Sequence, residues 1–419
     1  MGREIGDLAL MTMLGFSSGL PFLLSGYTLS MWLSTAHLGL EVIGLTANLG
    51  LPYLLKFLWA PVFDEVRPLF LGRRRGWLLP VQAALIACIV GLGLSNPVAH
   101  VWRTLGLAAA VAFCSASQDI LIDAWRIESF APRLQGMALA CEIWGYRVAA
   151  LISGAGAIAL SAHIGWHKAF LLMAALGLVG PVAVLLAREP VVTRAVMAKT
   201  GLRARLGMAV WAPLGEFLAR RGAVLVIAFI VLFRLGEALA GVMLPPYYVH
   251  LGFNRNAIAL ATGPAALLAA LAGAGLGGVL VARLGMGRAL VVSTLFQTLV
   301  MAMYPALGLF PGHASMLVAT SLVESFAGTL AYAAFLTYLS SLCDPEHTAT
   351  QYALLSSLSP LALHTVGGVS GVLADWFGFI PFFVFTTLAT LPALGVMLVI
   401  LRRYPPAPRR EVLTQAAGC

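Results

Sequence analysis

The feature that most constrains this chain is a series of twelve apolar runs, each long enough to cross a bilayer as a helix. A helix needs about 20 apolar residues to span roughly 30 Å of hydrocarbon. Backbone groups have no water to bond there, so an isolated span must be helical. The sequence therefore predicts an all-α polytopic membrane protein. The runs lie near residues 8–34, 42–63, 77–95, 102–126, 136–160, 166–187, 222–248, 256–282, 288–308, 313–341, 348–373 and 379–401.

Composition supports contact with lipid rather than with water or nucleic acid. Of the 419 residues, 60% are hydrophobic and only 10% are charged, whereas soluble proteins carry about 25% charged residues. The net charge of +9 comes mostly from short loops between apolar runs, so we expect a lipid-embedded chain that binds no nucleic acid. The five cysteines form no C-x-x-C pair, and we expect no metal or other cofactor.

The basic residues of the loops predict the orientation. With the N-terminus in the cytoplasm, twenty of the 26 basic residues lie on the cytoplasmic side, and only Arg103, Lys168 and Arg255 lie on the other. This bias follows the positive-inside rule. Both termini are then cytoplasmic, and the number of crossings is even.

The longest stretch without an apolar run, 188–221, divides the chain into two halves. We expect a six-helix bundle over 1–187, a cytoplasmic linker over 188–221, a second six-helix bundle over 222–402 and a cytoplasmic tail over 403–419. Within the linker, 207–219 has the pattern of a short interfacial amphipathic helix. Weak similarity between the halves indicates repeats around a central cavity.

Eight ionisable residues fall inside the apolar runs, at the predicted midplane or on its cytoplasmic side. Charges are costly in a membrane and are therefore candidates for function. The eight are Lys56, Asp119, Asp123, Glu142, Arg147, Arg234, Glu237 and Glu324.

The fourth run carries two carboxylates four residues apart, Asp119 and Asp123, which share one helix face. Arg126 lies one turn further, so a structural pair between Asp123 and Arg126 is one interpretation. Asp119 lies deeper, beside Gln118, and for Asp119 we favour a functional role.

The fifth run returns antiparallel, which puts Glu142, Tyr146 and Arg147 at depths close to that of Asp119. Glu142 and Arg147 are about 140° apart around the helix and cannot comfortably pair. We therefore expect Arg147 to pair with Asp119, with the Tyr146 hydroxyl close by.

Arg234 and Glu237 lie three residues apart on the seventh run. They form either a self-contained ion pair or a clamp in which Arg234 binds a carboxylate or phosphate of the substrate. Glu324 has no basic neighbour in sequence. Among the eight residues the carboxylates outnumber the cations, and a buried excess of carboxylates is costly unless some carry protons. Asp119, Asp123, Glu142 and Glu324 are therefore candidates for proton coupling.

The loop after the second run holds Asp64 and then Arg73, Arg74 and Arg75. The positive-inside rule alone accounts for three arginines. With Asp64, however, the cluster resembles the loop signature of major facilitator transporters, in which the acidic and basic residues form a gating network. Pro61 or a neighbour stands where that signature begins with Gly.

Several segments together resemble the AmpG-type muropeptide permeases, over nearly the whole chain. They are KFLWAPVFD (56–64), GRRRGWLL (72–79), FCSASQDILIDAW (113–125), GYRVAALISG (145–154), FRLGEALA (233–240) and ATQYALLSSLS (349–359). The resemblance implies a major facilitator fold. It also implies proton-driven import of N-acetylglucosamine–anhydro-N-acetylmuramic acid units bearing peptides across the bacterial inner membrane. Such recycling of peptidoglycan is linked to β-lactamase induction and so to antibiotic resistance.

The match carries seven residues over as candidate functional positions: Gln118, Asp119, Asp123, Tyr146, Arg147, Glu237 and Glu324. Together with Arg234, the expected substrate-binding set is Gln118, Tyr146, Arg147, Arg234 and Glu237. One departure bears on the cargo, because the eleventh run reads PLALHTVGG where a basic residue is expected.

The resemblance thus implies a muropeptide importer with the proton as coupling ion, and we expect it to be a monomer. The alternatives are a permease for a siderophore or an acetyl-coenzyme A-like cargo, or a membrane receptor or intramembrane enzyme. The chain has no H-E-x-x-H, no G-x-S-x-G and no paired metal ligands, which argues against an enzyme.

Overall fold

The computed structural model describes residues 2–36, 38, 46–66, 68, 70–190, 215–220, 222–253, 255–344, 347–367 and 370–403. Helices and turns make up this part of the chain, and it contains no β-strand. The predicted all-α class is therefore confirmed. Residues 191–214 and 221 of the predicted linker, including most of the expected amphipathic helix, lie outside the described residues, as does the tail from 404 onward.

The N-terminal half runs from α1 to α11. Its helices are α1 (Gly2–Ser25), α2 (Tyr27–Thr35), η1 (Thr46–Gly50), α4 (Leu51–Leu55), η2 (Lys56–Leu58), α5 (Ala60–Glu65), α6 (Arg73–Gly93), α7 (Val101–Ser129), η3 (Pro132–Leu134), α8 (Gln135–Leu151), a π-helical turn (Ile152–Gly156), α9 (Ala157–Ile164), α10 (Trp166–Leu176) and α11 (Val179–Leu186).

The C-terminal half runs from α13 to α23. Its helices are α13 (Ala223–Phe233), α14 (Leu235–His250), α15 (Arg255–Thr262), α16 (Pro264–Leu284), α17 (Met286–Met301), α18 (Met303–Leu307), α19 (Ala314–Leu342), α20 (Thr348–Gly367), α21 (Ser370–Phe377), α22 (Phe379–Leu388) and α23 (Leu391–Arg403).

Helical segments occupy all twelve predicted spans. Ten continuous helical stretches of the described chain are long and apolar enough to cross a membrane. The other two predicted spans, the second and the eleventh, correspond to the shorter helices η1 to α5 and to α20 with α21. The second span is segmented where Pro52 and Pro61 each lie in the first turn of a new helical piece, because proline fits the first turn of a helix but interrupts an interior.

Tight turns between consecutive spans depend on single glycines. Gly165 joins α9 to α10 at φ 82°, and Gly285 joins α16 to α17 at φ 77°. Glycine adopts this left-handed conformation without the steric cost that a Cβ brings. One residue is thus enough to turn the chain back across the bundle.

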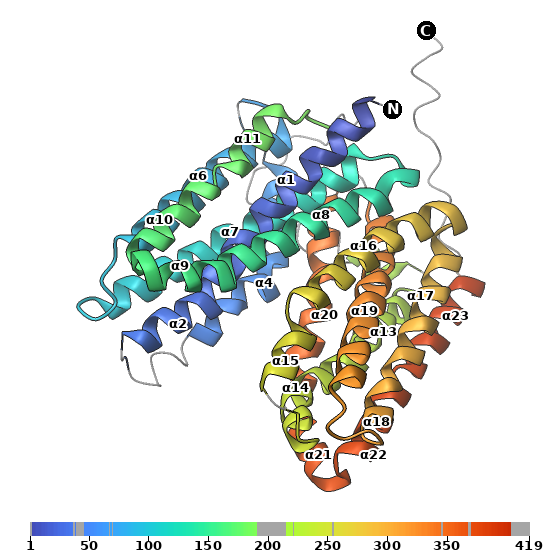
Figure 1. Ribbon diagram of the computed structural model, residues 1–419. Helices are drawn as coiled ribbons and strands as arrows, with labels where there is room; N and C mark the ends of the chain where they lie inside the picture. The colour runs from blue at the N-terminus through green and yellow to red at the C-terminus, as the bar shows by residue number, and fades with distance from the viewer. Residues whose placement is uncertain are drawn as a thin grey trace.

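The two halves lie together at the end of the molecule where α1 begins, and they spread apart toward the opposite end (Figure 1). We call the first the closed end. Contacts between the halves are made by α8 with α16 and α19, and by α20 with α5 and α7. The hydrophobic cores also interlock there, since Ile127 of α7 joins a core of the C-terminal half and Ala349 and Ala353 of α20 join a core of the N-terminal half.

Two glycines allow α8 and α16 to approach each other closely. A Cβ on Gly278 would lie 2.6 Å from the carbonyl oxygen of Gly136, and one on Gly136 would lie 3.0 Å from the carbonyl oxygen of Gly278. Small residues allow membrane helices to pack backbone against backbone in this way. The outer surface is strongly apolar, with Val224, Trp102 and Trp376 each about three-quarters exposed, as a lipid-facing surface requires.

Candidate functional site

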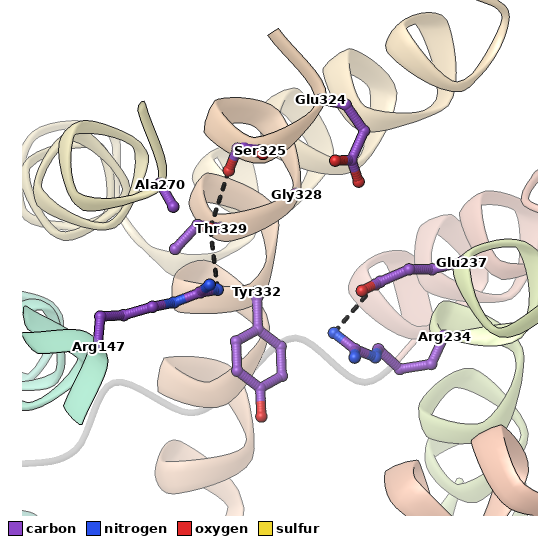
Figure 2. A pocket seen from close by; sticks show the side chains of 9 residues that line it. All are labelled: Arg147, Arg234, Glu237, Ala270, Glu324, Ser325, Gly328, Thr329 and Tyr332. Carbon is purple, nitrogen blue, oxygen red and sulfur yellow. Dashed lines mark hydrogen bonds and ion pairs between the residues drawn. The ribbon is translucent and has the colours of Figure 1, made fainter. Parts of the chain in front are cut away.

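A cavity of about 290 Å³ lies between the two halves, and charged side chains line it. Figure 2 shows Arg147 reaching toward it from one side and Arg234 and Glu237 from the other, with Tyr332 between them. The sequence places Arg147, Arg234, Glu237 and Glu324 near one depth, and the structure brings all four to this cavity. The full lining is Arg147, Arg234, Glu237, Ala270, Glu324, Ser325, Gly328, Thr329 and Tyr332.

Arg234 and Glu237 form an ion pair of 3.0 Å on the wall of the cavity. Arg234 is the residue between α13 and α14, and Glu237 is in the first turn of α14. The Arg234 guanidinium also lies over the Tyr332 ring, 4.9 Å from its centroid, a geometry that attracts a cation to the ring face. The structure therefore contains the ion pair that was one of the two interpretations of Arg234 and Glu237. Because the pair lies on the cavity wall, the second interpretation, in which Arg234 binds the substrate, remains a proposal.

Arg147 projects from α8 toward the C-terminal half and donates a hydrogen bond of 3.4 Å to the hydroxyl of Thr329 on α19. The predicted pair of Arg147 with Asp119 is therefore wrong. Depth along the helix was predicted from sequence, but the direction in which each side chain points around its helix was not.

Asp119 instead pairs with Lys56 of the second span. Its other oxygen accepts a hydrogen bond of 3.1 Å from the hydroxyl of Ser18 on α1. Lys56 is almost completely buried and Asp119 is about a quarter exposed. The two charges therefore neutralise each other inside the N-terminal half.

Asp123 and Glu142 share a single cation, Arg126. The Arg126 side chain lies 3.0 Å from Asp123 and 2.6 Å from Glu142, so the predicted pair of Asp123 with Arg126 is confirmed. Arg126 also crosses to the C-terminal half, where it donates to the Ser340 hydroxyl at 3.1 Å and lies 5.5 Å from the centroid of the Tyr352 ring. The cluster thus contains one carboxylate more than its cation balances.

Two residues of the expected substrate-binding set do not line the cavity. Gln118 is fully buried, and its amide donates to the Ser17 carbonyl at 2.7 Å and accepts from the Ser17 hydroxyl at 3.0 Å. Its place is therefore a helix-packing contact between α7 and α1, which corrects the prediction. Tyr146 packs its ring 6.2 Å from that of Phe22, on the N-terminal half beside the cavity rather than in its lining.

Glu324 occupies the middle of α19 and faces the cavity (Figure 2). Within the part of the chain that the structure describes, it forms no ion pair. A carboxyl group that lacks a counter-ion in a low-dielectric site can exist with or without its proton.

Asp64 and Arg74 form the centre of a buried network at the closed end, just beyond the second span. Arg74 lies 2.8 Å from Asp64 and 2.5 Å from Glu128, and Arg73 lies 2.9 Å from Glu128. Both Asp64 and Arg74 are fully buried. The charges therefore compensate one another within the network.

Asp64 also reaches across to the other half. Its carboxylate accepts hydrogen bonds from the Thr350 amide at 2.9 Å and from the Thr350 hydroxyl at 2.7 Å. Thr350 is in the first turn of α20, where helix amides lack partners within the helix and favour an anion. Burial alone raises the pKa of Asp64, but the charge of Arg74 and the hydrogen bonds from Thr350 and Arg74 outweigh it and hold that pKa below its ordinary 3.8.

Arg75 does not join the Asp64 network, which corrects the gating set expected from sequence. Its guanidinium donates to the carbonyls of Val184 at 2.9 Å and Leu185 at 3.1 Å. Glu189, at the start of the predicted linker, accepts the amides of Arg74 and Arg75 at 2.7 and 3.0 Å and so caps the start of α6.

Residues at these sites that the sequence analysis did not single out include Glu128, Thr329, Tyr332 and Thr350. Thr350 belongs to the segment ATQYALLSSLS, and Glu128 follows Arg126 by two residues. A hydroxyl or an aromatic ring does not stand out in an apolar run as a charge does. Glu128 is charged but lies just beyond the predicted run 102–126. Among the described residues, no group of three His, Cys, Asp or Glu side chains is arranged to hold a metal ion.

Comparison with known proteins gives relatives that match most of the chain. The sequence model of the Major Facilitator Superfamily matches residues 8–358. The anhydromuropeptide permease of Escherichia coli strain K12 is 37% identical over 393 residues, which cover 93% of this chain and 79% of the relative. The putative transporter AmpG 4 of Rickettsia felis is 31% identical over 395 residues, covering 93% and 95%.

Two solved structures show the same fold at low sequence identity. The fucose:proton symporter FucP of E. coli aligns with a TM-score of 0.70 at 12% identity, covering 95% of this chain and 98% of its own. A bacterial homologue of the iron transporter ferroportin, in an outward-facing state, aligns with a TM-score of 0.71 at 15% identity, covering 96% and 100%.

Proposed function

This chain belongs to the Major Facilitator Superfamily and, within it, to the family of AmpG-type muropeptide permeases, and we propose that it imports muropeptides across the bacterial inner membrane together with protons. The expected fold is confirmed, with its helices in two halves. The chain is a multi-pass membrane protein and a transporter rather than an enzyme.

The observation that carries the proposal is the charged cavity between the halves. Transporters of this architecture bind their cargo where the two repeats meet. The cavity offers two arginines, two glutamates, a tyrosine and two hydroxyls. Such a surface suits a polar cargo with several hydrogen-bonding groups and carboxylates, as a peptide-bearing sugar has.

Charge balance supports the coupling of cargo to protons. The cavity holds two cations, Arg147 and Arg234, and two carboxylates, Glu237 and Glu324. A cargo carboxylate adds one negative charge to this balanced set, and a proton on Glu324 restores neutrality in a site where net charge is costly. Glu142 and Asp123, which share Arg126, form a second place where one proton neutralises an excess carboxylate.

In this proposal, the contacts between the two halves at the closed end act as the gate of the transporter. Asp64 joins the two halves through Thr350, and Arg126 does so through Ser340. The positive-inside rule puts this end in the cytoplasm. The structure then corresponds to a state that receives cargo from the periplasm, and release into the cytoplasm requires these contacts to open.

The test is uptake of labelled anhydro-muropeptide into right-side-out vesicles that contain the protein. We expect saturable uptake that unlabelled muropeptide suppresses and that a siderophore or acetyl-coenzyme A leaves unchanged. Suppression by either of the latter, with no effect of muropeptide, would move the assignment to one of the related cargo classes.

A further inference from the structure

We infer that Arg147 is the carboxylate-binding subsite of the cavity, at which the peptide carboxylate of the cargo docks before Arg234 becomes available. The inference deepens the proposed function and rests on it. It names the feature of the cargo that the site selects, a free carboxylate, and the residue that selects it.

Arg147 is the cation of the cavity with unused binding capacity. A guanidinium carries five N–H donors in a rigid planar fork. Among the described residues, Arg147 uses this fork for one hydrogen bond, at 3.4 Å, to a neutral hydroxyl, and it forms no ion pair there. Its side chain is exposed on the wall of the cavity.

Arg234, in contrast, is already engaged. Glu237 lies 3.0 Å from it and the Tyr332 ring lies against its guanidinium. A cargo carboxylate must displace Glu237 before it can bind Arg234 in a two-pronged manner. No such displacement is needed at Arg147, so a carboxylate reaches Arg147 at lower cost.

Thr329 positions the guanidinium from the opposite half. Its hydroxyl donates to the Ser325 carbonyl at 2.9 Å within α19, which leaves its oxygen to accept from Arg147. The fork is thereby held at the boundary between α8 and α19, the two helices that would move relative to each other when the halves rearrange. A carboxylate bound there contacts both halves.

The chemistry predicts selectivity between two forms of one cargo. A carboxylate accepts two parallel charge-assisted hydrogen bonds from an arginine, and a carboxamide presents only one neutral acceptor oxygen. Loss of a hydrogen bond that involves a charged group corresponds to about 10- to 100-fold in Kd.

The experiment measures binding to the purified full-length protein in lipid nanodiscs by isothermal titration calorimetry. The probes are anhydro-muramyl tripeptide with free carboxylates and the same compound with its carboxylates amidated. The variants are Arg147→Gln, Arg147→Lys and the matched control Arg133→Gln. Arg133 is an exposed arginine at the closed end, paired with Glu4.

For the wild type and Arg133→Gln we expect the free-carboxylate probe to bind about 10- to 100-fold more tightly than the amidated one. In Arg147→Gln this preference should fall by about 10-fold or more, because the free-carboxylate probe loses its contact at Arg147 and the amidated probe loses little. Arg147→Lys, which keeps the charge but not the fork, should retain part of the preference.

A full preference that survives in Arg147→Gln overturns the subsite, and so does a wild type that binds both probes equally. Either result leaves the proposed function in place. A wild type that binds neither probe contradicts the proposed function itself. If Arg147→Gln does not fold, an unchanged preference in Arg147→Lys still counts against the two-pronged contact.

Discussion

The hydroxyl of Thr350 offers a direct way to weaken the closed end without removing a charge. It donates to Asp64 at 2.7 Å, and both residues are buried. Thr350→Val keeps the shape of the side chain and the backbone hydrogen bond of 2.9 Å but deletes the hydroxyl. Thr350→Ser, which retains the hydroxyl, is the matched control.

The size of the effect follows from the chemistry of this contact. A hydrogen bond to a charged acceptor contributes about 1.5–3 kcal/mol, and each 1.4 kcal/mol is about tenfold in an equilibrium constant. Since the contact joins the two halves, its loss acts on the equilibrium between closed and open arrangements. We expect Thr350→Val to raise the ratio of open to closed molecules by about 10- to 100-fold.

The assay is double electron–electron resonance between spin labels at positions 133 and 283. Arg133 and Arg283 are exposed at the closed end and belong to different halves. Longer separations should gain population in Thr350→Val and not in Thr350→Ser. A Thr350→Val protein that is folded and has the wild-type distance distribution refutes the reasoning.

Asp64 itself should make this gate insensitive to pH in the range of transport. Its pKa is held below 3.8 in the folded state by Arg74 and Thr350, against the effect of burial. The stability that it contributes is therefore complete above its unfolded pKa and is lost only as the pH falls through the lower folded value. Because Asp64 stays ionised, the distance distribution of the wild type should be the same at about pH 5 and at about pH 8. If the distribution does change over this range and Asp64→Asn abolishes the change, the pKa of Asp64 is raised rather than lowered.

Four further substitutions probe the membrane-embedded charges. Arg234→Lys should weaken cargo binding by about 10-fold or more, because an ammonium cannot replace the planar fork; unchanged affinity by calorimetry counts against a clamp at Arg234. Glu324→Gln should bind cargo but no longer accumulate it against a gradient, and retained proton-driven accumulation in vesicles rules out Glu324 as the coupling residue. Asp119→Asn leaves Lys56 buried without its ion pair and should cost about 3 kcal/mol of stability. Lys56→Met in the same chain should restore most of it, as measured by thermal unfolding in detergent, and no recovery would contradict the pairing.

The fold was predictable because one physical requirement dominates it. In hydrocarbon, every span must form its own backbone hydrogen bonds and is therefore helical. Apolar runs of sufficient length identify such spans directly in the sequence. The second span is one exception, since Pro52 and Pro61 divide it into short helices that composition alone does not reveal.

The sequence predicted which charged residues belong to the candidate site better than it predicted their contacts. Arg147, Arg234, Glu237 and Glu324 were found because charges in apolar runs are costly and therefore noticeable. Their partners depend on the rotation of each helix and on contacts between helices far apart in sequence. For this reason the sequence favours a pair of Asp119 with Arg147, whereas in the structure Asp119 pairs with Lys56.

Neutral residues were harder to predict than charged ones. The role of Thr350 arises only when the start of α20 is brought to Asp64, 286 residues away in sequence. The fit of Thr329 to Arg147 likewise depends on how the two halves meet. Hydroxyl groups are common in membrane helices, so only the three-dimensional arrangement distinguishes these two.

The most direct test of a proton-coupled muropeptide importer is the internal pH of proteoliposomes that contain only the purified protein and a pH-sensitive dye. With the lumen initially at the external pH, addition of anhydro-muropeptide outside should acidify the lumen. An equal concentration of siderophore should not do so, and Glu324→Gln should abolish the response. Uptake of the muropeptide without any change of internal pH would contradict the coupling, and the absence of both uptake and acidification in folded protein would contradict the account as a whole.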